Sequence, residues 1–398
     1  MLYAIFIVAL LLFGSLYIGP VTPRQLMAIV MFVVCWRNNA LQIDKYFKTY
    51  IVFIIGYLIA QIFTGYVAEL IRLLFGYYFV SFVAYQSTKL LIRKEGNANL
   101  LLWILLFLGL VDGLVTVGQM YQVPFTHEIS MLLGNSTLSD IYDVMSLRSQ
   151  DSMLGYTVPG LLGPVPNGYF LAAITLLCFY NSKAKLTTIN IVLVSFFVYA
   201  TFLVQERTAL AACVFLSLVC LYKILFSHGE VSVFKKVVAI VVILVAFVYY
   251  LPDFYSTVME GDSRYAMGFS LSEERGDITR NALEYLFTHP IGGINEFSTL
   301  YHYPHNLFIN AFMYGGLLGG IALIVLLLKQ VILLSKISLE KVSPNNIQRF
   351  IFAMMFACYT INSLTHNLSI VTGEPAFWIF WGAIIGLQTN KRVQDQKQ

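Results

Sequence analysis

Long apolar runs recur along this chain, and they constrain its fold more than any other feature. A helix that crosses the hydrocarbon of a bilayer needs roughly 20 mostly apolar residues, and the chain holds about twelve such segments. They are 2–18, 21–36, 47–66, 69–91, 99–118, 160–180, 186–204, 206–226, 234–251, 305–328, 349–366 and 371–388. Membrane-spanning strands are much shorter, so this pattern predicts helices and excludes a barrel. We therefore expect an all-α, polytopic membrane protein.

The composition favours the same class. Hydrophobic residues make up 58% of the chain and charged residues only 12%, whereas an ordinary soluble domain is about 25% charged. The net charge of +4 is small, and no nucleic-acid partner is expected. All five cysteines lie in or beside apolar runs and none forms a C-x-x-C pair, so neither a disulfide framework nor a metal knuckle is predicted.

The distribution of lysine and arginine predicts the orientation. The N-terminal stretch "MLYAIFIVALLLFGSLYIGP" lacks the basic region and cleavage site of a signal peptide, so it is interpreted as a first helix that stays. With both termini in the cytoplasm, 18 of the 25 basic residues fall inside, every lysine among them. The seven basic residues left outside are Arg24, Arg72, Arg148, Arg207, Arg264, Arg275 and Arg280.

This topology makes residues 1–398 one integral membrane domain with two long outer loops, 119–159 and 252–304. Long loops without structure of their own are usually functional or disordered. The second loop contains "SEERGDITRNALEYLFTHP", in which Ser272 is a plausible N-cap and Pro290 follows the end. We expect an external helix of about four turns there.

Glycines repeat with G-x-x-x-G spacing in the segment that begins "PHNLFINAFMYGGLLGG". The two pairs are Gly315 with Gly319 and Gly316 with Gly320. This spacing lets two helix backbones approach closely. Helix packing is the simplest interpretation of these four residues.

Arg207 lies in "FLVQERTALAACVFL", between two apolar segments with almost no loop. An arginine at that depth costs at least a few kcal/mol unless it is paired or faces a cavity. Glu206 is adjacent in sequence, but neighbouring helical residues do not face each other. The alternative interpretation is an arginine that snorkels to the outer interface.

The other outer arginines have a simple structural interpretation as well as a functional one. Arg275 and Arg280 are five residues apart on the expected external helix, so only one can point squarely at a given spot. Both could equally be exposed residues paired with acids on the same helix. Arg72 follows Glu69 by three residues, and that pair could neutralise itself on one helix face.

Histidines and asparagines gather at the expected outer ends of two segments. His305 follows "YHYP" and begins an apolar helix, while Asn306 is a good helix cap. His302 and His305 are three apart, but no cysteine or second carboxylate completes a ligand set, so no metal is expected. His366 lies in a second His-Asn pair at the same face. A capping or interfacial role is the alternative for each histidine.

Together these residues suggest arginines and a histidine gathered at the outer membrane surface. Arginine suits bidentate binding of phosphate, and a histidine can accept a proton from a hydroxyl near neutral pH. Such a set fits transfer from a lipid-linked diphosphate to an alcohol, with guanidinium groups offsetting the charge of the leaving diphosphate. Neither a metal nor another cofactor is required.

Three stretches resemble the bacterial O-antigen polymerase and O-antigen ligase superfamily (Wzy-like and WaaL-like proteins). "LVQERTALAA" is similar to the family's S-R-(G/T)-A-L segment and places Arg207 on its arginine, although Glu206 stands where the family commonly has Ser. "PHNLFINAFMYGGLLGG" is similar to H-N-x-(F/L)-(I/L) followed by G-x-x-G, and places His305 on the histidine.

The third stretch, "ERGDITRNALEYLFTHPIGGI", is similar to an arginine followed by A-L and then P-(I/L)-x-G. That spacing matches Arg275 rather than Arg280, with Ala282, Pro290 and Gly293 in step. The three stretches occur in the expected order over roughly residues 190–330.

The resemblance implies a GT-C-like inverting glycosyltransferase of the bacterial inner membrane, acting at the periplasmic face without metal. It implies a glycan donor and an acceptor carried on undecaprenyl diphosphate, embedded in membrane lipid. Arg207 and Arg275 would hold the diphosphate and His305 would orient or deprotonate the acceptor hydroxyl. Further candidates for diphosphate or glycan binding are Arg280, Asn306, Arg72, His302 and His366.

The motifs leave two enzymes open, and a transporter is a third alternative. A polymerase transfers the growing chain to another lipid-linked repeat unit, whereas a ligase transfers it to lipid A-core; the polymerase is favoured because no dedicated lipid A-core site is recognisable. Whether a chain-length regulator takes part stays open. A transporter or flippase of a lipid-linked or anionic solute would have internal repeats and helices broken near mid-bilayer. No repeat is found, and Asp112 in "LGLVDGLVTVG" is the feature that best favours transport.

Overall fold

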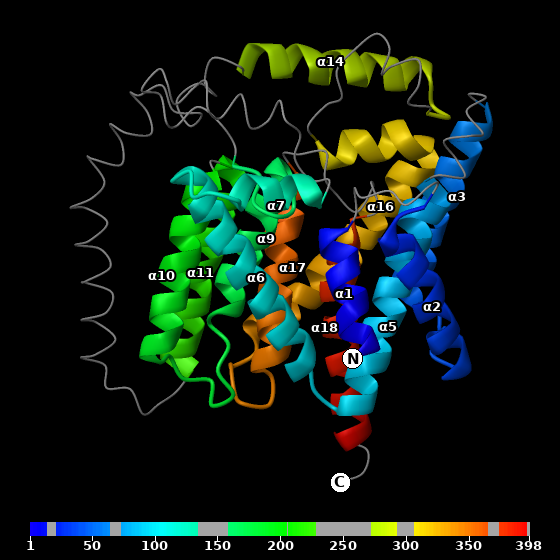
Figure 1. Ribbon diagram of the computed structural model, residues 1–398. Helices are drawn as coiled ribbons and strands as arrows, with labels where there is room; N and C mark the ends of the chain where they lie inside the picture. Colours follow the sequence, from blue (N-terminus) through cyan, green and yellow to red (C-terminus); the bar gives the residue numbers. More distant parts are fainter. Residues whose placement is uncertain are drawn as a thin grey trace. The chain divides into compact units, whose positions relative to one another are not determined.

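The protein is helical throughout the part of the chain that the computed structural model describes, and no β-strand occurs there (Figure 1). The described residues are 1–13, 21–63, 73–133, 158–204, 206–227, 272–292, 306–364 and 374–395. The helices are α1 (Leu2–Leu12), α2 (Pro23–Arg37), α3 (Lys45–Phe63), the π-helix η1 (Leu74–Phe79), α5 (Val80–Glu95), α6 (Asn99–Met120), α7 (Thr126–Leu132), α9 (Pro164–Leu177), α10 (Thr188–Val204), α11 (Arg207–Ser227), α14 (Ser272–Thr288), α16 (Leu307–Leu339), α17 (Ile347–Ser363) and α18 (Pro375–Asp395).

Most predicted apolar segments coincide with these helices. The predicted segment 234–251 lies outside the described residues, and the predicted external helix is α14, which begins at Ser272 as expected. Within the described residues, α3, α6, α11 and α16 are long and apolar enough to cross a membrane, and α1, α9 and α10 are shorter apolar helices. The described part of the chain is thus all-helical and has the apolar helices of a membrane protein, while twelve crossings and a GT-C-like architecture stay predictions.

The helices belong to two compact units. Unit 1 comprises Met1–Ile104, Ser272–Glu340 and Tyr359–Gln398, and unit 2 comprises Leu105–Leu271 and Lys341–Cys358. In unit 1, α3 packs along α16, and α18 packs along α5, which also contacts α1 and α2. In unit 2, α9, α10 and α11 pack against one another (Figure 1).

Glycine sets how closely α3 and α16 approach in unit 1. A Cβ on Gly56 of α3 would lie 2.7 Å from both the carbonyl oxygen of Gly315 and the backbone nitrogen of Gly319. Real Cβ atoms essentially never come so near to backbone. The predicted packing role of Gly315 and Gly319 is therefore confirmed, and Gly56 is the partner that the sequence pattern did not reveal.

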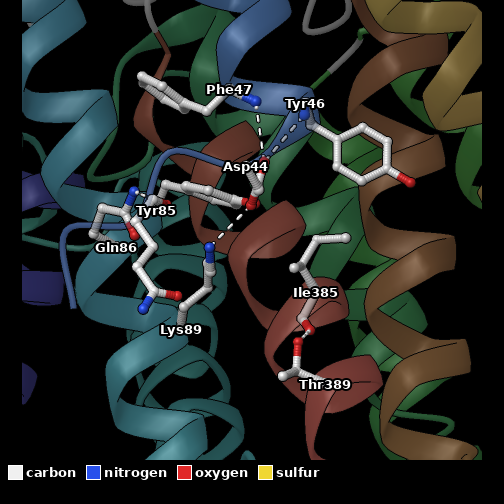
Figure 2. A network of polar contacts seen from close by, with 9 residues as sticks. Asp44, Tyr46, Phe47, Tyr85, Gln86, Lys89, Ile385 and Thr389 are labelled. Carbon is white, nitrogen blue, oxygen red and sulfur yellow. Dashed lines mark hydrogen bonds and ion pairs between the residues drawn. The ribbon is translucent and has the colours of Figure 1, made fainter. Parts of the chain in front are cut away.

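The opposite end of unit 1 is held by a polar network around Asp44 (Figure 2). One carboxylate oxygen caps α3 by accepting the N–H groups of Tyr46 (3.1 Å) and Phe47 (3.2 Å). The other oxygen pairs with Lys89 Nζ of α5 at 2.9 Å and accepts the hydroxyl of Tyr85. Burial raises the pKa of Asp44, but Lys89 and these hydrogen bonds outweigh it, so the pKa lies below its ordinary value.

A buried polar cluster organises one end of unit 2. Asp112 and Thr116 of α6 and Asn167 of α9 are fully buried. Asp112 Oδ1 accepts the N–H of Leu161 at 2.7 Å, and Asn167 Nδ2 donates to the carbonyl of Val158 at 3.0 Å. These bonds pin the turn that leads into α9, because its backbone groups find partners in the side chains of two helices.

Candidate functional site

Helix α16 is broken at Gly316. Its 33 residues form one helix by hydrogen bonding, but Gly316 has φ of 60° and ψ of −163°, which is not a helical conformation. A positive φ favours glycine because it has no Cβ. The break divides α16 into a short segment, 307–315, and a long one, 317–339.

A turn that follows α14 fills this break. The carbonyl of Pro290 accepts the N–H of Leu317 at 2.9 Å, which satisfies a backbone group that the break leaves without a helical partner. Gly292, with φ of 82°, lies so close that its Cβ would be 2.6 Å from the backbone nitrogen of Gly316. A Cβ on Gly316 would in turn overlap the carbonyl oxygen of Ile291. Two glycines therefore let the two backbones meet without intervening side chains.

Side chains extend the contact between α14 and the short segment of α16. Ala282 is fully buried against Ile309 and Met313, and Tyr285 and Leu286 pack against the same cluster. Alanine is small enough to bring α14 close to its partner. The segment that contains Arg275 thus packs against α16, the helix whose first turn follows His305.

Asn306 caps the short segment of α16. Its side-chain oxygen accepts the N–H groups of Phe308 at 3.0 Å and Ile309 at 3.1 Å. An asparagine cap contributes roughly 1 kcal/mol to a helix. The structure therefore gives Asn306 a capping role, and its predicted role in substrate binding stays a prediction.

Tyrosines gather beside the break. The rings of Tyr57 in α3 and Tyr314 in α16 lie 6.1 Å apart, and Tyr78 in η1 lies 5.6 Å from Tyr57. Tyr57 and Tyr78 are buried, while Tyr314 is half-buried. π-Helical turns such as η1 are rare in proteins, and those that do occur often lie at functional sites. Because the tyrosines and η1 lie beside the α16 break, this end of unit 1 is the strongest candidate site among the described residues.

Two charged residues lie at helix starts in unit 1. Arg24 stands in the first turn of α2, and Glu374 directly precedes α18. The two interact electrostatically, and Glu374 also accepts the N–H of Ala376 at 3.5 Å, a long hydrogen bond. The sequence marked Arg24 as an outer arginine but gave no reason to pair it with Glu374, which is 350 residues away.

An apolar groove opens between α14 and the break. Its volume is about 340 Å³, and apolar residues form its walls. They are Leu283, Leu286, Phe287, Pro290, Phe312 and Leu317. Among the described residues no charged side chain lines this groove, and its apolar walls suit a hydrocarbon group.

Arg207 belongs to unit 2, where it is the half-buried first residue of α11. Glu206, which is buried, precedes it, and its backbone carbonyl accepts the N–H of Leu210 at 2.9 Å. The close approach of Glu206 to Gly168 of α9 places the start of α11 beside Asn167 and therefore beside the buried polar cluster. Arg207 thus lies near the buried polar cluster of unit 2, and its predicted position at the outer membrane surface stays a prediction.

The other predicted site residues are only partly described. Arg275 lies within α14, but its side chain is outside the described part of the structure. Arg280 is exposed and pairs with Glu284 at 3.2 Å on the same helix. Arg72, His302, His305 and His366 lie outside the described residues. The structure therefore brings together the segments that contain Arg275 and Asn306, which both belong to unit 1. Arg207 belongs to unit 2.

Metal ligands and reactive thiols are not gathered in the part of the chain that is described. No group of three or more histidine, cysteine, aspartate or glutamate residues there is arranged to hold a metal ion. All five cysteines are free and buried. The described residues of the candidate site thus offer backbone groups, tyrosine rings and apolar side chains.

Comparison with known proteins does not assign the chain to a family. No protein-family model, no curated protein and no solved structure matches the chain.

Proposed function

We propose that the protein is a membrane glycosyltransferase that polymerises a surface polysaccharide. It would transfer a growing glycan from undecaprenyl diphosphate to a hydroxyl of a lipid-linked repeat unit at the periplasmic face of a bacterial inner membrane. The observation that carries the proposal is the contact between α14 and α16. Ala282 and Pro290, which belong to the motif that contains Arg275, make that contact with the helix that follows His305.

The proposed reaction is a direct displacement. The acceptor oxygen forms a bond to the anomeric carbon while the bond from that carbon to the phosphate oxygen breaks, which inverts the configuration. His305 takes the proton of the acceptor hydroxyl. Arg207 and Arg275 offset the negative charge on the departing undecaprenyl diphosphate. No metal ion is needed in this scheme.

The α16 break bears on the transporter alternative, because Gly316 lies near the middle of the predicted apolar segment 305–328. The enzyme is favoured by the contact between α14 and α16 and not by the depth of the break. Asp112, the residue that best favours transport, uses one oxygen to hold the turn before α9.

Single substitutions test the proposed site. We expect Arg207→Ala, Arg275→Ala and His305→Ala each to lower long-chain polysaccharide at least about 100-fold in a deletion strain, at normal expression. Arg93→Ala is the matched control, because Arg93 is an exposed arginine at the end of α5. Normal chain synthesis by all three site variants would refute the assignment.

A second experiment separates the polymerase from the ligase. Purified protein is incubated with lipid-linked repeat unit alone, and the products are resolved by length. A ladder of longer lipid-linked chains supports the polymerase. Product that forms only after lipid A-core is added identifies a ligase. Movement of a lipid-linked solute across the bilayer of proteoliposomes without any transfer identifies a transporter.

A further inference from the structure

An exposed apolar strip runs along one side of α14. Phe287 is 87% exposed, and Leu283 and Ile291 are 43% and 46% exposed. Leu283 and Phe287 are four residues apart and therefore share one side of the helix, and Ile291 lies in the turn that follows. This side differs from the one that packs against α16, where Ala282 is fully buried. Adjacent exposed apolar side chains of this size favour an apolar neighbour.

The apolar groove lies directly beside this strip. Leu283 and Phe287 belong to both, and Phe312 and Leu317 form the opposite wall on α16. The strip and the groove are therefore one continuous apolar surface, of which α14 provides one side and the broken helix provides the other.

This surface continues into the membrane-facing side of α16. Leu317 is 57% exposed, and Leu318, Ile321 and Leu328 further along the helix are exposed as well. α16 is long and apolar enough to cross a membrane, so exposed leucines on it face lipid. The groove shares Leu317 with that face and opens toward the same hydrocarbon.

Charge on α14 fixes how the helix meets the bilayer. Arg280 and Glu284 form an ion pair with exposed side chains, and Asp277 is exposed near them. Asp277 and Glu284 lie on the side away from the α16 contact, next to the apolar strip, and Arg280 lies two turns before Phe287 on nearly the same side. A helix with adjoining apolar and charged sides lies in the membrane interface, with its apolar side in the acyl chains and its charges in the headgroups.

We propose that α14 is an interfacial helix and that the groove beside it binds one acyl chain of a bilayer phospholipid. The lipid would enter from the leaflet that α14 faces and pack between Phe287 and Leu317. A lipid chain bound there would hold α14 against the α16 break. This inference goes beyond the glycosyl transfer proposed above, because it concerns bulk membrane lipid and does not require a catalytic activity.

Spin labels test the interfacial position of α14 in phosphatidylcholine nanodiscs. Labels are placed at Phe287→Cys and at Thr288→Cys, which is one residue on and about 100° round the helix. The five native cysteines are buried, and unsubstituted protein reports any background labelling. We expect the ratio of collisions with oxygen to collisions with a water-soluble nickel complex to be several-fold higher at position 287. Equal, nickel-dominated ratios at both positions would overturn the proposal.

A photoreactive phosphatidylcholine with a diazirine in its acyl chain tests the groove. We expect crosslinks within residues 283–291 and 312–317, and we expect Leu283→Glu to remove most of them because a carboxylate repels hydrocarbon. Glu284→Gln is the control, since Glu284 does not line the groove. Unchanged crosslinking in Leu283→Glu would overturn the proposal. Displacement of the probe by a polyisoprenyl phosphate but not by excess phosphatidylcholine would also overturn it and assign the groove to a lipid carrier.

Discussion

The two ends of unit 1 are held together by different physical means. At the Gly316 end, the turn at residues 290–292 meets α16 through backbone atoms and glycines. At the Asp44 end, a carboxylate joins the start of α3 to α5 through Lys89 and Tyr85. Backbone contacts tolerate no added atom, whereas side-chain contacts tolerate conservative exchange and respond to pH. Substitutions at the two ends should therefore differ in size and in kind.

The largest effect is expected at Gly316. Gly316→Ala adds a Cβ at a positive φ and drives it into the carbonyl of Ile291, which should destabilise unit 1 by at least about 3 kcal/mol. Gly96→Ala is the matched control, because Gly96 has φ of 74° but open space around it; it should cost only about 1 to 2 kcal/mol. Thermal unfolding in nanodiscs measures both. Equal losses would show that the α14 turn does not press on the break.

A smaller loss is expected where α3 crosses α16. Gly56→Ala forces α3 away from the backbone of Gly315 and Gly319, and overpacking of this kind costs about 1 to 3 kcal/mol. Gly76→Ala is a milder control, because its Cβ would meet only the side-chain nitrogen of Gln25 at 3.1 Å. Thermal unfolding again gives the comparison. A stability of Gly56→Ala equal to that of the unsubstituted protein would contradict the close crossing.

At the other end, Asp44→Asn keeps a side-chain oxygen that can cap α3 but removes the charge that pairs with Lys89. We expect a loss of about 1 to 2 kcal/mol at neutral pH. Because the pKa of Asp44 is lowered in the folded protein, the carboxylate stabilises the fold above its unfolded pKa of about 3.9. That contribution disappears as pH falls through the still lower folded pKa.

The measurement for Asp44 is the unfolding midpoint as a function of pH. The gap between the native protein and Asp44→Asn should be constant from about pH 5 to pH 8 and should close below about pH 4. A gap that stays open in acid would mean that the charge of Asp44 contributes nothing.

Substitutions of Asn306 test whether this residue only caps α16 or also binds substrate. Asn306→Ala should cost about 1 kcal/mol, and Asn306→Asp should restore most of it because a carboxylate also caps helices. Stability and polysaccharide synthesis are measured on the same preparations. Recovery of stability in Asn306→Asp without recovery of synthesis would assign Asn306 a role in binding as well as capping.

The smallest effect is expected at Arg280. Its ion pair with Glu284 is exposed on both sides, and exposed pairs on one helix contribute about 0.5 kcal/mol or less. Arg280→Ala should therefore leave the unfolding midpoint nearly unchanged, and high salt should remove what difference there is. A loss comparable to that of Asp44→Asn would show that Arg280 has a partner beyond Glu284.

The sequence by itself determined the class of this protein and most of its helices. Apolar runs and charge are properties of local stretches, so they predict where a helix lies and that lipid surrounds it. For the same reason the sequence predicted α14, with Ser272 at its start, and the cap provided by Asn306. The spacing of Gly315 and Gly319 likewise predicted a close helix crossing.

Tertiary structure alone decided which segments meet. Gly56 opposes Gly315 across about 260 residues, and the turn at Pro290 enters a helix break that the uninterrupted apolar run 305–328 did not reveal. Asp44 and Lys89 are 45 residues apart and share no local pattern. Such contacts depend on how helices pack against each other. A glycine in the sequence indicates that another group can approach closely, but it does not indicate which group does so.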